Sequence, residues 1–139
     1  MVAGAGAGAG AGAAPPPATE PAIIVSTYPD KAAASGAAAA LVGAGLAACV
    51  NISEISSFYS WEGKMVEDER EHIAIFKTTS DRKEELKERI GATHPYDVPE
   101  IAEIAVSDVN GPYMRWLAAS TGSPAAAATA PGGGRGDGP

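Results

Sequence analysis

FYSWEGK at Phe58–Lys64 is the stretch of this sequence that decides the fold. It continues a predicted strand, Ala48–Ser57, and its Glu62-Gly63-Lys64 end predicts a bend or bulge, because glycine adopts unusual backbone dihedrals easily. We expect Glu67-Asp68-Glu69 to turn the chain and Glu71–Thr79 (EHIAIFKTT) to return as the next strand. The resulting hairpin is too long for one helix layer to cover, so part of it should project or meet another subunit.

Upstream of this hairpin, the sequence predicts a strand followed by a helix. Ala22–Tyr28 (AIIVSTY) is rich in β-branched residues and ends before a Pro-Asp pair. Asp30 can accept backbone N–H bonds in the first turn of a helix that we expect to run to about Leu46. Alanine dominates this helix, and its small side chain favours both helix formation and close packing on a sheet.

Downstream, the pattern predicts a second helix, a strand and a short third helix. Asp81 and Glu84 have the spacing of a capping box, and Gly91 is suited to closing that helix. Ile101–Ser107 (IAEIAVS) predicts a fourth strand. Gly111-Pro112 predicts the start of the last helix, because proline is tolerated in a first helical turn.

The order β-α-β-β-α-β, with a short C-terminal helix, predicts an α+β fold of the ferredoxin-like split β-α-β type. Right-handed crossovers then give an antiparallel four-stranded sheet with two helices on one face. The other face has no cover within the chain, so we expect an oligomer.

Composition limits both the domain boundaries and the partners. Residues 1–19 and 122–139 are rich in Ala, Gly and Pro, so we expect disordered tails around one domain at 20–121. The formal net charge of −7, with no basic stripe, argues against nucleic-acid binding. No membrane-spanning stretch is evident, and Cys49 is the only cysteine, which leads us to expect a cytoplasmic protein without a disulfide.

Five motifs in order resemble the CutA family, named for divalent-cation tolerance, over residues 22–119. They are LAACVNI at Leu46–Ile52, FYSWEGK, FKT at Phe76–Thr78, HPYDVPE at His94–Glu100 and YMRWL at Tyr113–Leu117. The resemblance implies a ferredoxin-like subunit in a homotrimer similar to PII signalling proteins, and a link to copper and other divalent cations. It implies no established catalytic activity and no organic cofactor.

Two residues are candidate metal ligands. Cys49 should lie on the sheet face opposite Val50 and Ile52, where its thiolate would suit a soft ion such as copper(I). The alternative is a small apolar residue in the subunit interface. His94 should lie at a helix end, where the dipole favours its cation, and it could bind metal or handle a proton. The alternative is a histidine bonded to backbone.

A second candidate site combines aromatic rings with opposite charges, a composition suited to a small pocket between subunits. Its predicted residues are Tyr59, Trp61, Glu62, Lys77, Tyr96, Glu100 and Trp116. The alternative is an interface core with satisfied ion pairs.

These patterns favour a trimeric metal-associated binding protein of the copper-tolerance type, involved in the response to metal ions. The alternative is a PII-like sensor of a small anionic or zwitterionic metabolite in the inter-subunit cleft. A purely structural trimer is a further alternative. We expect no enzymatic activity, because the sequence has no nucleophile motif and no phosphate loop.

Overall fold

The computed structural model of the chain describes residues 19–122. The disordered tails predicted at 1–19 and 122–139 lie outside the described residues except for their inner ends, Thr19 and Gly122. The elements are β1 (Pro21–Tyr28), α1 (Lys31–Gly43), β2 (Cys49–Trp61), β3 (Lys64–Thr79), α2 (Lys83–Thr93), β4 (Ala102–Ala105) and α3 (Gly111–Ser120). Thr19 and Gly122, which the sequence assigned to the tails, make defined contacts. Thr19 Oγ1 donates to Asp81 Oδ2, and the Gly122 N–H donates to the Gly45 carbonyl.

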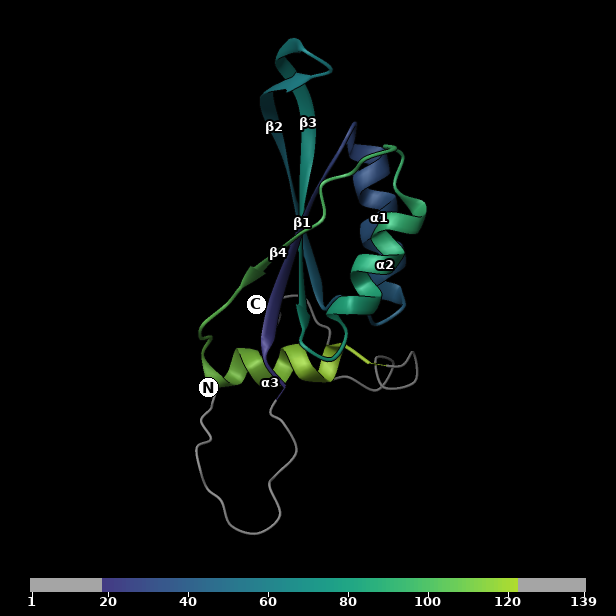
Figure 1. Cartoon of the computed structure of the whole chain (residues 1–139). Helices are drawn as coiled ribbons and strands as arrows, with labels where there is room; N and C mark the ends of the chain where they lie inside the picture. The colour runs from purple at the N-terminus through teal and green to yellow at the C-terminus, as the bar shows by residue number, and fades with distance from the viewer. Residues whose placement is uncertain (1–18, 123–139) are drawn as a thin grey trace.

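The strands form one antiparallel sheet in the order β2-β3-β1-β4, which confirms the predicted ferredoxin-like topology. Helices α1 and α2 lie side by side on one face, and α3 crosses the base of the sheet (Figure 1). The far end of the β2–β3 hairpin projects beyond all other elements (Figure 1). No helix among residues 19–122 is long and apolar enough to cross a membrane.

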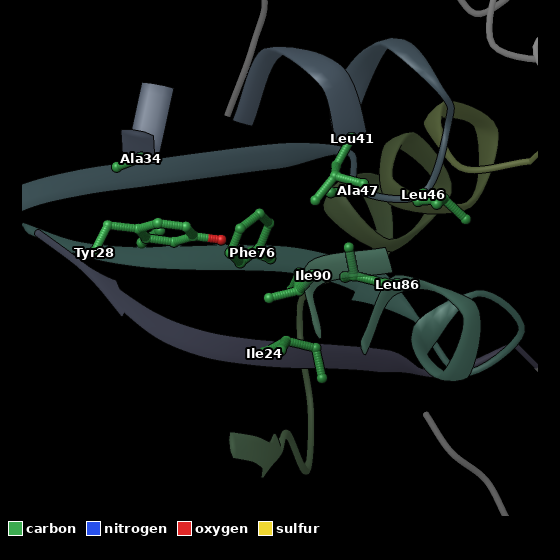
Figure 2. Packing of buried hydrophobic residues seen from close by; sticks show 10 residues of the cluster. Ile24, Tyr28, Ala34, Leu41, Leu46, Ala47, Phe76, Leu86 and Ile90 are labelled. Carbon is green, nitrogen blue, oxygen red and sulfur yellow. The ribbon is translucent and has the colours of Figure 1, made fainter. Parts of the chain in front are cut away.

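The core lies between the sheet and α1 and α2 (Figure 2). Ile24 of β1 pairs with Phe76 of β3, and Phe76 also pairs with Val50 of β2. Because side chains alternate across a strand, this row faces the helices, where Leu41 and Leu86 pack against it. Ile24 and Phe76 are fully buried, so this half of the domain is stabilised by its own chain.

The hairpin turns at Glu62-Gly63, and the prediction that the chain turns at residues 67–69 is wrong. Both turn residues have positive φ angles, 53° and 79°, and Trp61 pairs directly with Lys64. Such a two-residue turn matches the natural twist of the strands. The acidic residues lie within β3 instead, where Asp68 (φ 54°) takes up an irregularity in the strand register.

Helix α1 begins as predicted but ends earlier. The Asp30 side chain caps it by accepting the Ala33 N–H at 2.8 Å. The helix stops at Gly43 rather than near Leu46, because Gly45 adopts a φ of 75° that reverses the chain.

The predicted capping box and glycine stop of α2 are wrong. The helix starts at Lys83, so Arg82 occupies the N-cap position, and its guanidinium has no acceptor with which to cap the helix. Asp81 lies outside the helix and accepts from Thr19. Gly91 lies inside the helix, which continues to Thr93. Strand β4 is also shorter than the predicted Ile101–Ser107, since only four residues pair with β1.

Candidate functional site

The sheet face away from α1 and α2 has a cross-strand row at its base. Cys49 pairs with Lys77, Lys77 with Ile23, and Ile23 with Ile104, so one residue from each strand lies on this row. Because the neighbouring row points at the helices, these four side chains point the other way. We call the surface made by this row the open face.

Cys49 lies on the open face as predicted, since Val50 and Ile52 pack against the core on the other side. Its thiol is free and half-buried. Its Sγ makes a long hydrogen bond of 4.0 Å to Asn51 Oδ1. Asn51 follows two residues later on the same strand, so both side chains face the same way. A thiol and an amide oxygen alone do not complete a metal site.

His94 ends α2 and is held by backbone on both ring nitrogens. Nε2 lies 2.9 Å from the Thr27 carbonyl, and Nδ1 accepts the Tyr96 N–H at 3.1 Å. These partners fix the neutral tautomer with the proton on Nε2, because a carbonyl accepts and an N–H donates. Burial lowers the pKa of His94, against a smaller raising effect of the Thr27 carbonyl. The expected helix-end cation is therefore not the favoured form.

The two predicted metal ligands lie on opposite faces of the sheet. The His94 ring stacks on Tyr28, a core residue of the helix-covered face, at 4.3 Å between centroids. Cys49 lies on the open face. No group of three or more His, Cys, Asp or Glu side chains suited to a metal occurs among residues 19–122. A metal site is thus not assembled by this part of a single chain.

Two tyrosine–carboxylate pairs lie where the hairpin leaves the domain. Tyr96 donates its hydroxyl to Glu71 Oε2 at 2.7 Å, and Tyr59 donates to Glu69 Oε1. Burial, and then the Glu71 carboxylate, raise the pKa of Tyr96. The hydrogen bond to Glu69 raises the pKa of Tyr59 to about 12. Both phenols therefore remain protonated donors at neutral pH.

The predicted aromatic–charge set divides into separate places in one chain. Tyr59, Trp61 and Glu62 belong to the hairpin arm and its tip, and Lys77 lies on the open face. Tyr96 and Glu100 lie between α2 and β4, and Trp116 lies on α3. Tyr59 lies close enough to Tyr96 to contribute slightly to the raised pKa of that phenol. A single described chain does not build the predicted pocket, which leaves a pocket between subunits as a prediction.

The chain matches the family model described as CutA1 divalent ion tolerance protein over residues 22–120. This chain belongs to the CutA1 family. It is 48% identical over 99 residues to the divalent-cation tolerance protein CutA of Pyrococcus horikoshii, covering 71% of this chain and 96% of that one. The Thermus thermophilus CutA protein is 43% identical over 101 residues, covering 72% and 97%.

Solved CutA1 structures share the fold. The crystal structure of CutA1 from Pyrococcus horikoshii aligns with a TM-score of 0.70 at 46% identity, covering 73% of this chain and 99% of that one. A structure described as the periplasmic divalent cation tolerance protein CutA from Archaeoglobus fulgidus aligns with a TM-score of 0.69 at 33% identity, covering 72% and 97%. Membership of the divalent-cation tolerance family is thus established by sequence and by fold.

Three further residues of this CutA1 chain shape its candidate sites and were not among the predicted site residues. Ser26 lies 3.1 Å from His94 Nε2, and Glu71 is a buried acceptor for Tyr96. Tyr113 stacks on Trp116 at 5.8 Å and is close enough to Cys49 for its charge to raise the tyrosine pKa, after burial. The i,i+3 spacing of Tyr113 and Trp116 was the only signal for such a contact.

Proposed function

We propose that this CutA1 protein acts as a copper-binding homotrimer in the response to metal ions. Its family membership over residues 22–120 is the observation that carries this proposal. Relatives are named for divalent-cation tolerance, which fits a protein that binds or buffers an ion. The choice of copper as the ion and the trimeric assembly go beyond family membership and are part of this proposal.

Exposed apolar side chains support self-association. Phe58, Trp61 and Met65, near the hairpin tip, have exposed fractions of 64%, 50% and 66%, and Ile104 on the open face is 49% exposed. Clustered apolar exposure of this kind is typical of interaction surfaces. We expect sedimentation equilibrium to give three times the chain mass, and a monomer at every concentration would contradict the proposal.

The copper site is proposed to use Cys49 thiolates from neighbouring copies, because one described chain offers no complete ligand set. Thiolate is the preferred ligand of copper(I) among protein side chains. His94 stays a predicted ligand, which would have to give up its bond to Thr27 or to Tyr96 in order to bind.

Calorimetric titration with copper(I) tests these assignments on wild type, Cys49→Ala and His94→Ala. We expect the Cys49 variant to weaken binding at least about tenfold. A smaller loss for His94→Ala would agree with its engaged ring nitrogens. Unchanged affinity in both variants would remove both residues from the metal site.

A sensor of a small anionic or zwitterionic metabolite is the second candidate function. Lys77 is half-buried, and none of the ion pairs found among residues 19–122 includes it. A thermal-shift screen against metabolites tests this candidate, because a ligand that binds only the folded state raises the melting temperature. No response to any metabolite, with copper binding intact, would favour the first proposal.

We further propose that the protein is a non-enzymatic binding protein of the cytoplasm. Relatives described as periplasmic or chloroplastic show that the family is not confined to one compartment. Cell fractionation tests the location. A broad activity screen tests the absence of catalysis, with any turnover that depends on His94 counting against it.

A further inference from the structure

The β2–β3 hairpin leaves the sheet at one position in β3. Strand β1 ends at Tyr28, which pairs with His72, and Glu71 is the next residue of β3 toward the hairpin tip. Among residues 19–122, β3 pairs only with β2 from Glu71 to the tip, and we call this two-stranded part, residues 55–71, the arm. Two strands without a third neighbour are weakly stable alone, so the direction of the arm depends on the contacts at Glu71.

Tyr96 bonds β3 at this position. Its hydroxyl donates to Glu71 Oε2 at 2.7 Å, and the Glu71 side chain is buried. A buried carboxylate that loses its donor is destabilised, because it has also lost its hydration, so the bond from Tyr96 holds the carboxylate in place. Tyr96 therefore contacts the first residue of the arm, where β1 no longer supports β3.

His94 connects Tyr96 to the core end of β1. The His94 ring is stacked on the buried ring of Tyr28, with 4.3 Å between the centroids, and Nε2 lies 2.9 Å from the Thr27 carbonyl oxygen. On its other side, Nδ1 accepts the Tyr96 N–H at 3.1 Å. A continuous set of contacts thus runs from β1 through His94 and Tyr96 to Glu71. All these contacts lie within one chain, so they do not depend on which partner covers the open face.

We propose that His94 and Tyr96 form a clamp that fixes the direction of the arm before the chain assembles. The exposed side chains of Phe58, Trp61 and Met65 lie on this arm, so the clamp decides where they meet a partner. A surface that is ordered before association loses less conformational entropy on binding. The inference rests on the proposed trimer and names the contacts within one chain that prepare it for assembly. In this role Tyr96 is a positioning residue, because it acts through the arm.

Exchange of subunits between unlabelled and isotope-labelled full-length chains tests the clamp, with native mass spectrometry as the readout. Tyr96→Phe removes the donor to Glu71, so the arm should separate more readily from its partner. We expect exchange in this variant to be at least about tenfold faster than in wild type. Glu71→Gln keeps a carbonyl oxygen that accepts from the Tyr96 hydroxyl, and it should exchange at a rate close to that of wild type.

Ile24→Val is the matched control for a loss of stability alone. Ile24 is fully buried in the core and makes none of the clamp contacts, and its shortening lowers the unfolding free energy by an amount comparable with the loss of one hydrogen bond. Exchange in this variant should stay close to that of wild type. Equal acceleration in Ile24→Val and Tyr96→Phe, or no acceleration in Tyr96→Phe, would overturn the clamp. Exchange of Glu71→Gln as fast as that of Tyr96→Phe would overturn it as well.

A monomeric wild type would contradict the proposed trimer and still leave the clamp open to test. Spin labels at Lys64→Cys near the tip and Ser35→Cys on α1, in a Cys49→Ala background, report the direction of the arm within one chain. Adding Tyr96→Phe should widen the measured distance distribution at least about twofold. Equal widths with and without this substitution in the monomer would overturn the clamp.

Discussion

The helix-covered half of the domain and the projecting hairpin are built from the same strands but are stabilised in different ways. Near the base, Ile24 and Phe76 are fully buried beneath α1 and α2. Near the tip of the same β2–β3 ladder, Phe58 and Met65 are 64% and 66% exposed. The ladder hydrogen bonds continue along both halves, whereas apolar burial is confined to one.

This difference indicates that the hairpin depends on more than its own contacts. An isolated two-stranded hairpin is at best marginally stable in water. Here its base is extended from a buried sheet (Figure 1), and its exposed aromatic residues are ones that a partner could cover. Substitutions in the core should therefore change the unfolding free energy, and substitutions at the tip should change association.

Phe76→Ala and Phe58→Ala should separate the two halves most strongly. Phe76 is fully buried, so its truncation should lower the unfolding free energy by about 4 kcal/mol through lost burial and a cavity. Phe58→Ala should cost about 0.5 kcal/mol or less when the chain is monomeric. Urea unfolding at matched dilute concentrations measures both, and comparable losses would contradict the division.

Glycine substitutions probe how the helix-covered half is joined to its last helix. A Cβ on Gly45 would clash with the Gly122 carbonyl oxygen, and the Gly45 φ of 75° is unfavourable for alanine. Gly45→Ala should destabilise the domain by about 2 kcal/mol or more, because it combines backbone strain with a clash. Thermal unfolding gives the measurement.

Gly36→Ala is the matched control for this effect. Gly36 lies inside α1, and nothing surrounds its would-be Cβ within 4 Å. Alanine there should stabilise the helix by about 0.5–1 kcal/mol. The two substitutions should therefore change the unfolding free energy in opposite directions. A change in the same direction would refute the account of the Gly45 turn.

The sequence predicted the order of elements well because strand alternation and helix composition are local signals. Val50 and Ile52 face the core as alternation required. The predicted helix and strand boundaries were wrong where contacts between residues distant in sequence decide the local structure. Helix α2 begins one residue later than the predicted Asp81 cap requires, and Asp81 instead accepts from Thr19, a contact that no local pattern contains.

The candidate site was less predictable for the same reason. Burial lowers the pKa of His94, and the Thr27 carbonyl selects its tautomer, whereas the helix-end argument considered only its own helix. The predicted aromatic–charge set assumed that its motifs converge, but the long β2 arm carries Trp61 and Glu62 to the tip.

Two tyrosine substitutions test the junction between the halves. Tyr96→Phe leaves the buried carboxylate of Glu71 without its donor, so it should cost about 1 kcal/mol or more in unfolding free energy. Tyr59→Phe removes a comparable bond to Glu69 on the exposed arm, where water can replace the donor, and should have no measurable effect. Urea unfolding measures both variants. An equal loss of unfolding free energy would show that the tyrosine–carboxylate bond on the arm is as stabilising as the one at the junction.

The smallest difference in stability between the two halves is expected for their ion pairs, those of Glu103 in the helix-covered half and that of Glu54 on the hairpin. Glu103 of β4 accepts from Lys83 at 2.7 Å and from Lys87 at 2.8 Å, and these bonds lower its pKa to about 2. Since the unfolded carboxyl titrates near 4.5, this stabilisation is complete above that pH and is lost as the pH falls toward 2.

Glu103→Gln should therefore have a lower unfolding free energy than wild type at pH 7. The difference between the two proteins should disappear as the pH falls. The control is Glu54→Gln, because Glu54 pairs with Arg70 on the hairpin at 3.3 Å with side chains 55% and 78% exposed. Exposed pairs contribute little, so its unfolding curve should follow wild type across the same pH range. Unfolding measured from pH 7 to pH 2 decides between the pairs. A pH-dependent difference in unfolding free energy between Glu54→Gln and wild type would mean that the ion pair on the hairpin stabilises the fold as much as those of the helix-covered half.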